Sequence, residues 1–211
     1  TSINSENDEI EELCKMENYN LFRGSENDVL KRFYETAKKF GLNTTIRICA
    51  DDPLIDPETI NKVLEEFGKG DFDYLSNVKL RSYPRGLDVE VFSFEALEKA
   101  HFIAKEIPER EHVTMFIYGN PKMFKVEGII AEGIFRRPEF RLCVDTKEDF
   151  KLMKILYNKF YKNDEIVNIR KVIEFLDENL EISKLNLVSE EEQRMRNLRE
   201  GVKQNVVGEK D

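Results

Sequence analysis

The sequence predicts an α/β domain in three layers, with helices on both faces of a mainly parallel, mixed sheet. Short apolar segments alternate with amphipathic helical segments along most of the chain, as in folds built from strand–helix units. A length of 211 residues with 40% apolar residues provides enough material for one hydrophobic core. We therefore expect one α/β domain over residues 1–188, followed by a polar helix or tail over residues 189–211.

Composition excludes several classes of protein. The 33 Lys and Arg residues against 42 Asp and Glu give a formal net charge of −9, so no nucleic-acid partner is expected. No run of 18 apolar residues occurs, which argues against a membrane span, and residues 1–8 do not resemble a signal peptide. The three cysteines are scattered and match neither zinc-ligand spacing nor a disulfide framework, so a cytoplasmic protein is expected.

The first third of the chain predicts two helices around a short strand. Ser5 is a good N-cap, and the apolar spacing after it predicts a helix. Residues 20–23 predict a short strand that ends at Gly24. The apolar stripe over residues 29–40 predicts a second helix, which ends at Gly41.

A buried strand and a well-capped helix follow. Residues 44–50 are rich in β-branched and apolar side chains, which is typical of a buried strand. Asp56 is a good N-cap and Pro57 a good first residue for a helix that continues over 58–67. By the same criteria we expect further strands over 73–77, 89–92, 123–126 and 140–144, and further helices over 94–106, 109–119, 147–160 and 166–179.

Carboxylates follow two of the expected strands. Asp51 and Asp52 come after the strand that ends at Ala50, and Asp145 comes directly after Val144. Ligands of α/β sheets bind beyond the carboxyl ends of the strands, and converging carboxylates suit Mg²⁺. The alternative is that these residues cap helices or form turns.

Five segments carry a family resemblance. In chain order they read RGSENDVL (23–30), IRICADDPLIDP (46–57), GLDVEVFS (86–93), REHVT (110–114) and VDTKED (144–149). They resemble motifs of the spore-coat-polysaccharide type of cytidylyltransferase, which is related to the enzymes that activate Kdo and neuraminic acids as CMP-sugars. The resemblance implies a Rossmann-like nucleotide-diphospho-sugar transferase fold.

The resemblance also implies a reaction. A hydroxyl of a sugar acid or sugar phosphate would attack the α-phosphate of CTP and release pyrophosphate, in the biosynthesis of surface polysaccharides or glycoconjugates. Asp51 and Asp145 match the family's Mg²⁺ ligands, and Arg47 lies on the strand that leads to Asp51. A homodimer is implied, with contacts from residues 94–140.

The chain departs from the family pattern in two places. Asp52 stands where the family usually has a small or neutral residue, so its carboxylate either tunes the metal affinity or points away. The family's first strand and its phosphate-binding loop have no counterpart, so we expect a sheet that lacks its first strand.

The remaining candidate site residues each have a structural alternative. Arg47 contacts either a substrate phosphate or carboxylate, or an acid on a neighbouring strand. His112 is either a substrate contact or a hydrogen-bonded structural group. The candidates for substrate binding are Asn77, Arg81, Arg85, Asp88 and Glu90 on one loop, where plain exposure of the two arginines is the alternative, together with Glu111 and His112.

Two other functions remain open at this point. A nucleotide-sugar glycosyltransferase shares this type of fold, and fold similarity does not fix the reaction. A catalytically incompetent homologue that acts as a binding subunit is the second alternative. The spacing of Leu97, Ala100, Ile103 and Ala104 fits either a dimer interface or the core, and we expect the core.

Overall fold

The computed structural model describes residues 1–163 and 165–187 of the protein. The expected polar tail over 189–211 lies outside the described residues. No helix among the described residues is long and apolar enough to span a membrane.

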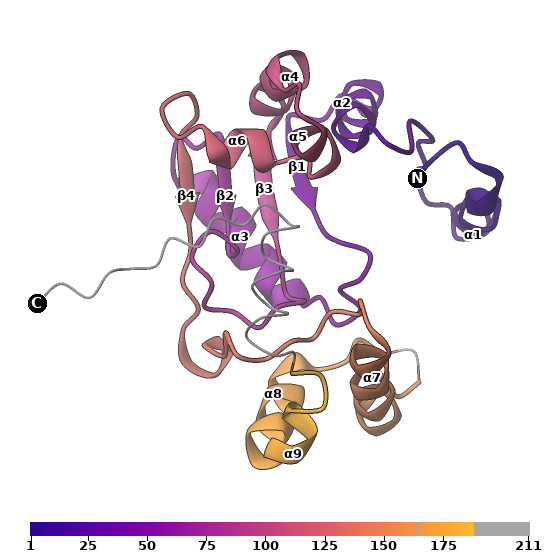
Figure 1. Cartoon of the computed structure of the whole chain (residues 1–211), viewed down its shortest axis with the longest axis vertical. Coiled ribbons are helices and arrows are strands. Elements are labelled where there is room, and N and C mark those ends of the chain that lie inside the picture. Colours follow the sequence, from indigo (N-terminus) through magenta and orange to yellow (C-terminus); the bar gives the residue numbers. More distant parts are fainter. Residues whose placement is uncertain (164, 188–211) are drawn as a thin grey trace, which may run out of the picture.

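A four-stranded sheet forms the centre of the domain (Figure 1). Its spatial order is β1-β3-β2-β4, with β1 at Thr44–Arg47, β2 at Tyr74–Ser76, β3 at Glu90–Ser93 and β4 at Val126–Gly128. The strand β3 is antiparallel to β1 and β2, whereas β2 and β4 are parallel. The predicted mixed sheet is confirmed, but two of its three described pairings are antiparallel, because the chain returns from β2 to β3 without a crossover helix.

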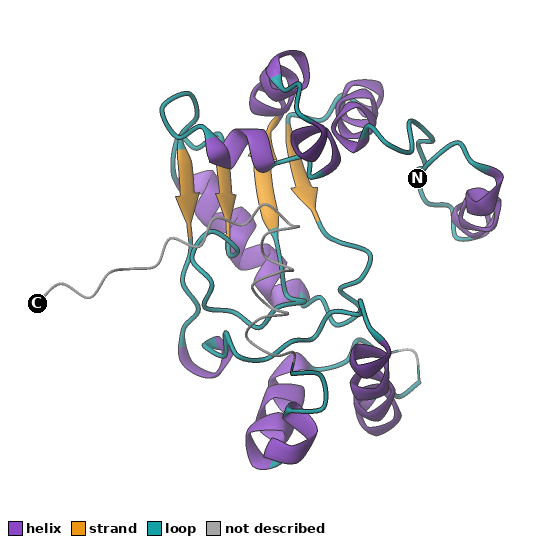
Figure 2. Cartoon of the chain, in the orientation of Figure 1, coloured by secondary structure: helices purple, strands orange, loops and turns teal. Residues whose placement is uncertain are grey.

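Helices cover both faces of this sheet (Figure 2), which confirms the predicted three layers. The helix α3 (Pro57–Lys69) packs Val63 against Leu75 and Val91 on one face. On the other face, Tyr74 and Phe92 join the core of α2 (Val29–Phe40), α4 (Phe94–Ile103) and α6 (Met115–Gly119). Successive residues of β2 and β3 thus enter opposite cores, as strand geometry requires.

The helix ends at Asp56 and Gly41 follow the predicted signals. The predicted N-cap Ser5 is wrong, because Ser5 is the first residue of a short helix over 5–7 and its side chain caps no helix. The Asp56 carboxylate accepts a hydrogen bond of 2.8 Å from the backbone N–H of Thr59, and Pro57 begins α3. The helix α2 ends at Gly41, which has a left-handed φ of 65°. In α4, Leu97 and Ala100 are fully buried, which confirms the expected core role, although Ile103 is 42% exposed.

A second core lies beyond the end of the sheet. It contains α7 (Lys147–Phe160), α8 (Ile169–Glu178), α9 (Leu180–Ser183) and the short helix η2 (Gly133–Phe135), seen below the sheet in Figure 1. Leu54, Leu87 and Leu142 enter this core from three separate loops. Burial of these side chains holds the loops after β1, before β3 and before α7 against the same helices.

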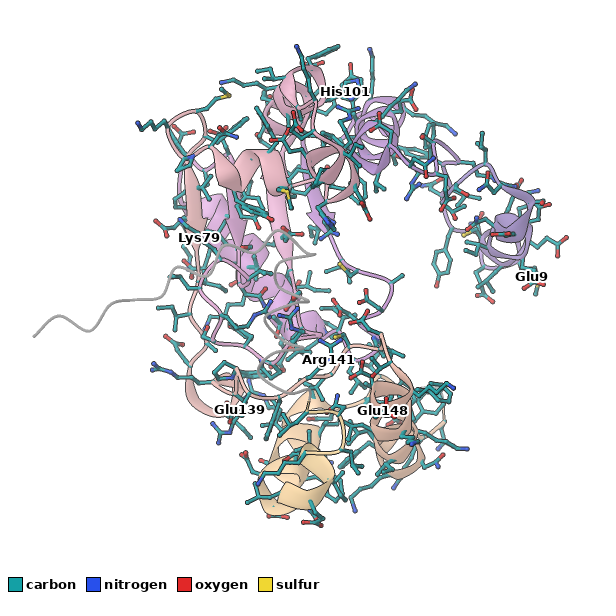
Figure 3. The ribbon with its side chains drawn as sticks, viewed as in Figure 1. Glu9, Lys79, His101, Glu139, Arg141 and Glu148 are labelled. Atoms are coloured by element: carbon teal, nitrogen blue, oxygen red, sulfur yellow. The ribbon has the colours of Figure 1, made fainter. Side chains whose placement is uncertain are left out.

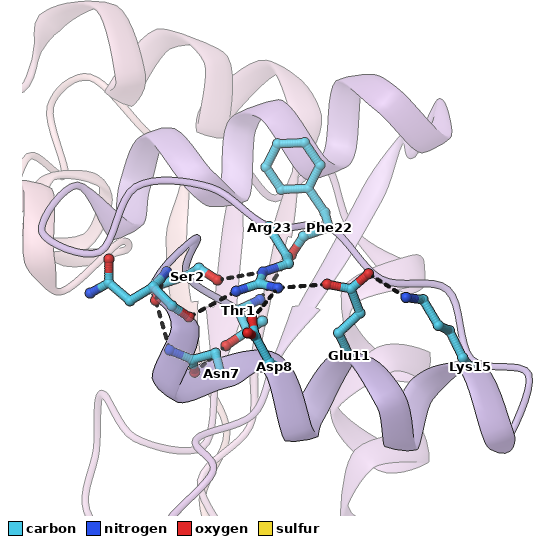
Figure 4. A network of polar contacts seen from close by, with 9 residues as sticks. Thr1, Ser2, Asn7, Asp8, Glu11, Lys15, Phe22 and Arg23 are labelled. Atoms are coloured by element: carbon cyan, nitrogen blue, oxygen red, sulfur yellow. Dashed lines mark hydrogen bonds and ion pairs between the residues drawn. The ribbon is translucent and has the colours of Figure 1, made fainter.

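The N-terminal residues form a separate arm, which contains η1 (Ser5–Asn7) and α1 (Asp8–Met16) (Figure 1). The Arg23 guanidinium holds this arm, as Figure 4 shows, through the carbonyls of Ser2 and Asn4 and the carboxylates of Asp8 and Glu11. The predicted strand over 20–23 is wrong for this reason. The chain here turns toward the arm and pairs only through one bridge, between Ser2 and Gly24.

Two further predictions need correction. The helix expected over 109–119 is divided into α5 (Ile107–Glu111) and α6, because buried Val113 has a φ of 47°, which no helix accommodates. The strand expected over 140–144 forms only one bridge, between Arg85 and Arg141.

Gly86 allows the loop before β3 to approach the backbone of the loop before α7 closely. Its φ is 98°, and a Cβ atom at this position would lie 2.4 Å from the carbonyl carbon of Leu142. We therefore expect Gly86→Ala to lower the free energy of unfolding by about 2–4 kcal/mol, measured by urea denaturation.

Gly68 provides the matched control for this substitution. It lies within α3, and a Cβ atom there meets nothing within 4 Å, so Gly68→Ala should stabilise the protein by about 0.5–1 kcal/mol. Equal effects of the two substitutions would contradict the role of Gly86.

Candidate functional site

Three chain segments meet at the end of the sheet. The loop after β1 carries Asp51. The backbone carbonyl of Asp51 accepts a hydrogen bond of 2.9 Å from the N–H of Val144. The segment before α7 also pairs with the β2–β3 loop, since Arg85 N–H donates to the Phe140 carbonyl at 2.9 Å. These backbone bonds bring the two predicted groups of carboxylates into one place.

Asp51, Asp52 and Cys143 form an acidic cluster at this meeting point. One carboxylate oxygen from each aspartate and the Cys143 sulfur all lie within 4.8 Å of one another. Asp51 is partly exposed, whereas Asp52 is only 6% and Cys143 only 3% exposed. The Oδ2 atom of Asp52 is buried and has no hydrogen-bond partner among the described residues. The cluster therefore offers one oxygen from each aspartate and one sulfur to a cation.

Burial and like charges disfavour ionised carboxylates in the cluster. Burial, followed by the negative charges of Asp88 and Asp51, raises the pKa of Asp52 to about 8, against a smaller opposing effect of Arg81. Burial also raises the pKa of Asp51, and the charge of Asp145 adds to this. The pKa of the Cys143 thiol is likewise raised by burial.

Asp145 lies beside the cluster and is already paired. Its Oδ2 atom is an acceptor for the Cys143 thiol at 3.8 Å and forms an ion pair with Arg141. Arg141, labelled near the foot of the sheet in Figure 3, also donates to the buried Asp149 at 3.0 Å. The structure thus brings Asp145 next to Asp51, as predicted, but its role as a metal ligand stays a prediction.

Arg47 pairs with an acid across the sheet, which is one of its two predicted alternatives. The Arg47 guanidinium is bonded to Glu90, its register partner on β3. The buried Glu90 carboxylate also accepts hydrogen bonds from Tyr74 Oη at 2.7 Å and Thr114 Oγ1 at 2.6 Å. Glu90 is therefore committed to a structural network, and substrate contact by either residue stays a prediction.

The β2–β3 loop is braced by its own polar residues. The fully buried Asn77 donates to the Leu87 carbonyl at 2.6 Å and accepts from the Val89 N–H at 2.8 Å. Arg81 and Asp88 form a bidentate ion pair, in which the guanidinium Nη1 and Nη2 atoms donate to the two carboxylate oxygens at 2.5 and 2.9 Å. The loop carries two further cationic residues, of which Arg85 is half-buried and Lys79 is exposed. These hydrogen bonds within the loop hold it in one conformation beside the cluster.

Glu111 and His112 lie at the junction of α5 and α6. Glu111 is exposed and His112 is half-buried. The strained Val113 turns the backbone here, so that the next residue, Thr114, points inward to Glu90. The junction is therefore connected to the site through Glu90 and Arg47.

Sequence reasoning missed two residues of this site. Neither Cys143 nor Arg141 is among the candidate site residues that the sequence predicts. A signal was available for Cys143, because its position two residues before Asp145 places it at the same strand end. No sequence signal distinguishes Arg141 from other arginines.

A groove of about 470 Å³ adjoins the exposed side of Asp51. Its walls are mainly apolar and include Pro53, Val144, Phe150 and Met153. This volume lies within the range of small-molecule sites, and Asp51 supplies its one carboxylate among the lining residues.

A three-layer α/β domain with a carboxylate cluster at the ends of its strands is the architecture of enzymes that handle phosphate groups with a cation. A family model described as "Cytidylyltransferase" matches residues 1–199. The chain belongs to this cytidylyltransferase family and is a nucleotidyltransferase. Family membership favours nucleotidyl transfer over the two alternatives, a glycosyltransferase and a non-enzymatic binding subunit.

Three individual proteins are similar to this chain over most of its length. The uncharacterized protein MJ1063 of Methanocaldococcus jannaschii is 43% identical over 188 residues, which cover 88% of this chain and 74% of the relative. The spore coat polysaccharide biosynthesis protein SpsF of Bacillus subtilis is 32% identical over 85% of this chain and 73% of its own length. A solved cytidylyltransferase from Leptospira borgpetersenii matches with a TM-score of 0.81 and 28% identity, covering 90% of this chain and 79% of that one.

The pKa of Asp52 predicts a pH dependence of stability. A carboxyl whose pKa is raised on folding stabilises the protein at low pH, and this contribution is lost as the pH rises through the folded-state pKa of about 8. In the presence of a chelator, the wild type should lose up to about 1.4 kcal/mol per pH unit between about pH 4 and pH 8, relative to Asp52→Asn. Denaturant unfolding of both proteins at several pH values measures this difference, and parallel profiles would contradict it.

Proposed function

We propose that this protein transfers CMP from CTP to a hydroxyl of a sugar acid or sugar phosphate and releases pyrophosphate. The single observation that carries the proposal is the acidic cluster, which lies at the strand ends of a cytidylyltransferase-family fold. The spore-coat name of the Bacillus relative supports a sugar acceptor in polysaccharide biosynthesis.

The donor set at the cluster suits a divalent cation. The unpartnered oxygen of Asp52 and the exposed side of Asp51 are oxygen ligands of the kind that Mg²⁺ takes. We infer that Asp51 and Asp145 hold Mg²⁺. When bound, the ion supplies neutralisation of the negative charge on the phosphates.

The chain's own residues orient the substrates. Arg81 and Arg85 lie on the braced loop, and Arg81 is paired with Asp88. Their proposed role is to bind phosphate oxygens of the triphosphate. Asn77, Asp88, Glu90, Glu111 and His112 keep their proposed role in substrate binding. The groove beside Asp51 is large enough for one of the two substrates. Phosphoryl chemistry of this type depends mainly on such positioning and charge neutralisation.

The setting proposed for this reaction is the cytoplasm, and the proposed assembly is a homodimer. The three cysteines are all free, which suits a reducing compartment.

Release of pyrophosphate from CTP tests the function. The full chain, with Mg²⁺ and a panel of sugar acids and sugar phosphates, should release pyrophosphate and form a CMP-sugar with at least one acceptor. Absence of product with every acceptor class would overturn the proposal.

Asp51→Asn should reduce kcat by about 10²-fold or more, because it removes the exposed carboxylate of the cluster. Asp71→Asn is the matched control, since the Asp71 side chain is 92% exposed and its ion pair among the described residues is with Lys125. The control should retain wild-type kcat. Equal activity of the two variants would contradict the role of Asp51.

A further inference from the structure

We propose that Arg141 is a positioning residue for CMP transfer, whose guanidinium orients the Asp145 carboxylate for binding of the cation. This role rests on the proposed function in one respect, since Asp145 is there a ligand of Mg²⁺. Arg141 precedes α7 at the end of the sheet (Figure 3) and is only 6% exposed. A buried charge of this kind requires partners within the protein.

The Arg141 guanidinium contacts two carboxylates at once. Its Nε atom donates to Asp149 Oδ1 at 3.0 Å, and its Nη2 atom donates to Asp145 Oδ2. The same Nη2 atom lies 3.4 Å from Asp149 Oδ2. The N–H groups of a guanidinium have fixed directions in one plane, so an arginine that is held on one carboxylate determines the place of a second one. Arg141 therefore sets the position of Asp145 relative to Asp149.

Asp149 is the fixed point of this arrangement. It is only 1% exposed, and its Oδ2 atom accepts hydrogen bonds from the backbone N–H groups of Asp145 and Thr146 at 3.0 and 2.9 Å. Its Oδ1 atom accepts from Nδ2 of the buried Asn186 at 2.8 Å, and this Nδ2 atom also donates to the Arg141 carbonyl at 2.9 Å. Both the side chain and the backbone of Arg141 are thus held before its contact with Asp145 is made.

Asp145 differs from Asp149 in its exposure and in its free valence. Its side chain is 45% exposed. Its Oδ2 atom is bound by Arg141 and by the Cys143 thiol, whereas its Oδ1 atom accepts no hydrogen bond within the described part of the chain. A carboxylate that is held through one oxygen presents the other in a fixed direction, which is how hydrogen-bonded partners orient carboxylates that bind metals. The contact with Arg141 therefore leaves Oδ1 available to a cation.

Arg137 provides a comparison within the same helical core. Its Nε and Nη2 atoms donate to the two carboxylate oxygens of Asp177 at 2.8 Å each. Arg137 thus makes a bidentate ion pair, as Arg141 does with Asp149, but its carboxylate partner among the described residues is Asp177 alone. A loss of ion pairing without a loss of Asp145 orientation can therefore be produced at Arg137.

Titration of the full chain with Mn²⁺ alone tests the inference, with the free ion followed by electron paramagnetic resonance. Arg141→Lys keeps a positive charge for Asp149 but loses the planar fork, so it should weaken Mn²⁺ binding by about tenfold to a hundredfold. Arg137→Lys is the matched control and should bind Mn²⁺ as the wild type does. Asp145→Asn should weaken Mn²⁺ binding at least as much as Arg141→Lys.

Urea denaturation of each variant establishes that it is folded. If Arg141→Lys does not fold, the double substitution Arg141→Gln with Asp149→Asn takes its place, because two neutral amides leave no buried charge without a counter-ion. The double variant should show the same loss of Mn²⁺ affinity.

Wild-type Mn²⁺ affinity in the folded Arg141 variant would overturn the inference, and so would an equal loss in Arg137→Lys. A higher affinity would also overturn it, because Arg141 would then mask Asp145 and not orient it. Asp145→Asn separates this failure from a failure of the proposed function. If Asp145→Asn alone weakens binding, Asp145 remains a ligand and only the positioning role is wrong. If neither variant changes the affinity, or if the wild type binds no Mn²⁺, the proposed metal site fails together with the inference.

Discussion

One buried carboxylate, that of Glu90, ties the sheet to the helical layer above it. It lies on the central strand β3 and binds Arg47 of β1, Tyr74 of β2 and Thr114 beside α6. A buried charge is costly unless every oxygen is satisfied, and here both oxygens have partners. Removal of this carboxylate would leave the half-buried Arg47 guanidinium without its counter-ion. The register of β1, and with it the course of the loop to Asp51, therefore depends on this contact.

The site lies on loops that are anchored by the second hydrophobic core, around α7 and α8. Leu54, Leu87 and Leu142 enter one cluster of buried side chains, so the segments that carry Asp52, Asp88 and Cys143 are anchored a few residues away from their polar groups. Apolar burial supplies the energy, and backbone hydrogen bonds between the segments set the spacing. Carboxylates that repel one another are thereby kept close, which is the condition for binding a cation and a triphosphate.

Patterns of local chemistry predicted most of the fold. The capping by Asp56, the helix over 147–160 and the end of α2 at Gly41 all follow from local signals, and each is confirmed. The predictions that failed depend on contacts distant in sequence: Arg23 draws residues 20–23 toward the N-terminal arm, and core packing holds Val113 in a left-handed conformation that ends α5. For the same reason the sequence located Asp51 and Asp145 at one site, but it did not reveal that Asp145 is paired with Arg141 or that Cys143 faces the carboxylates.

The central claim is that one cation and the CTP triphosphate meet at the loop after β1. Anomalous scattering from a crystal grown with CTP and Mn²⁺ tests it directly, because the ion is located independently of any assumed mechanism. The account predicts an anomalous peak about 2.0–2.4 Å from an Asp51 oxygen, with a triphosphate oxygen as a further ligand. An ordered triphosphate whose ion is bound elsewhere, without contact to Asp51 or its neighbours in the cluster, would contradict it.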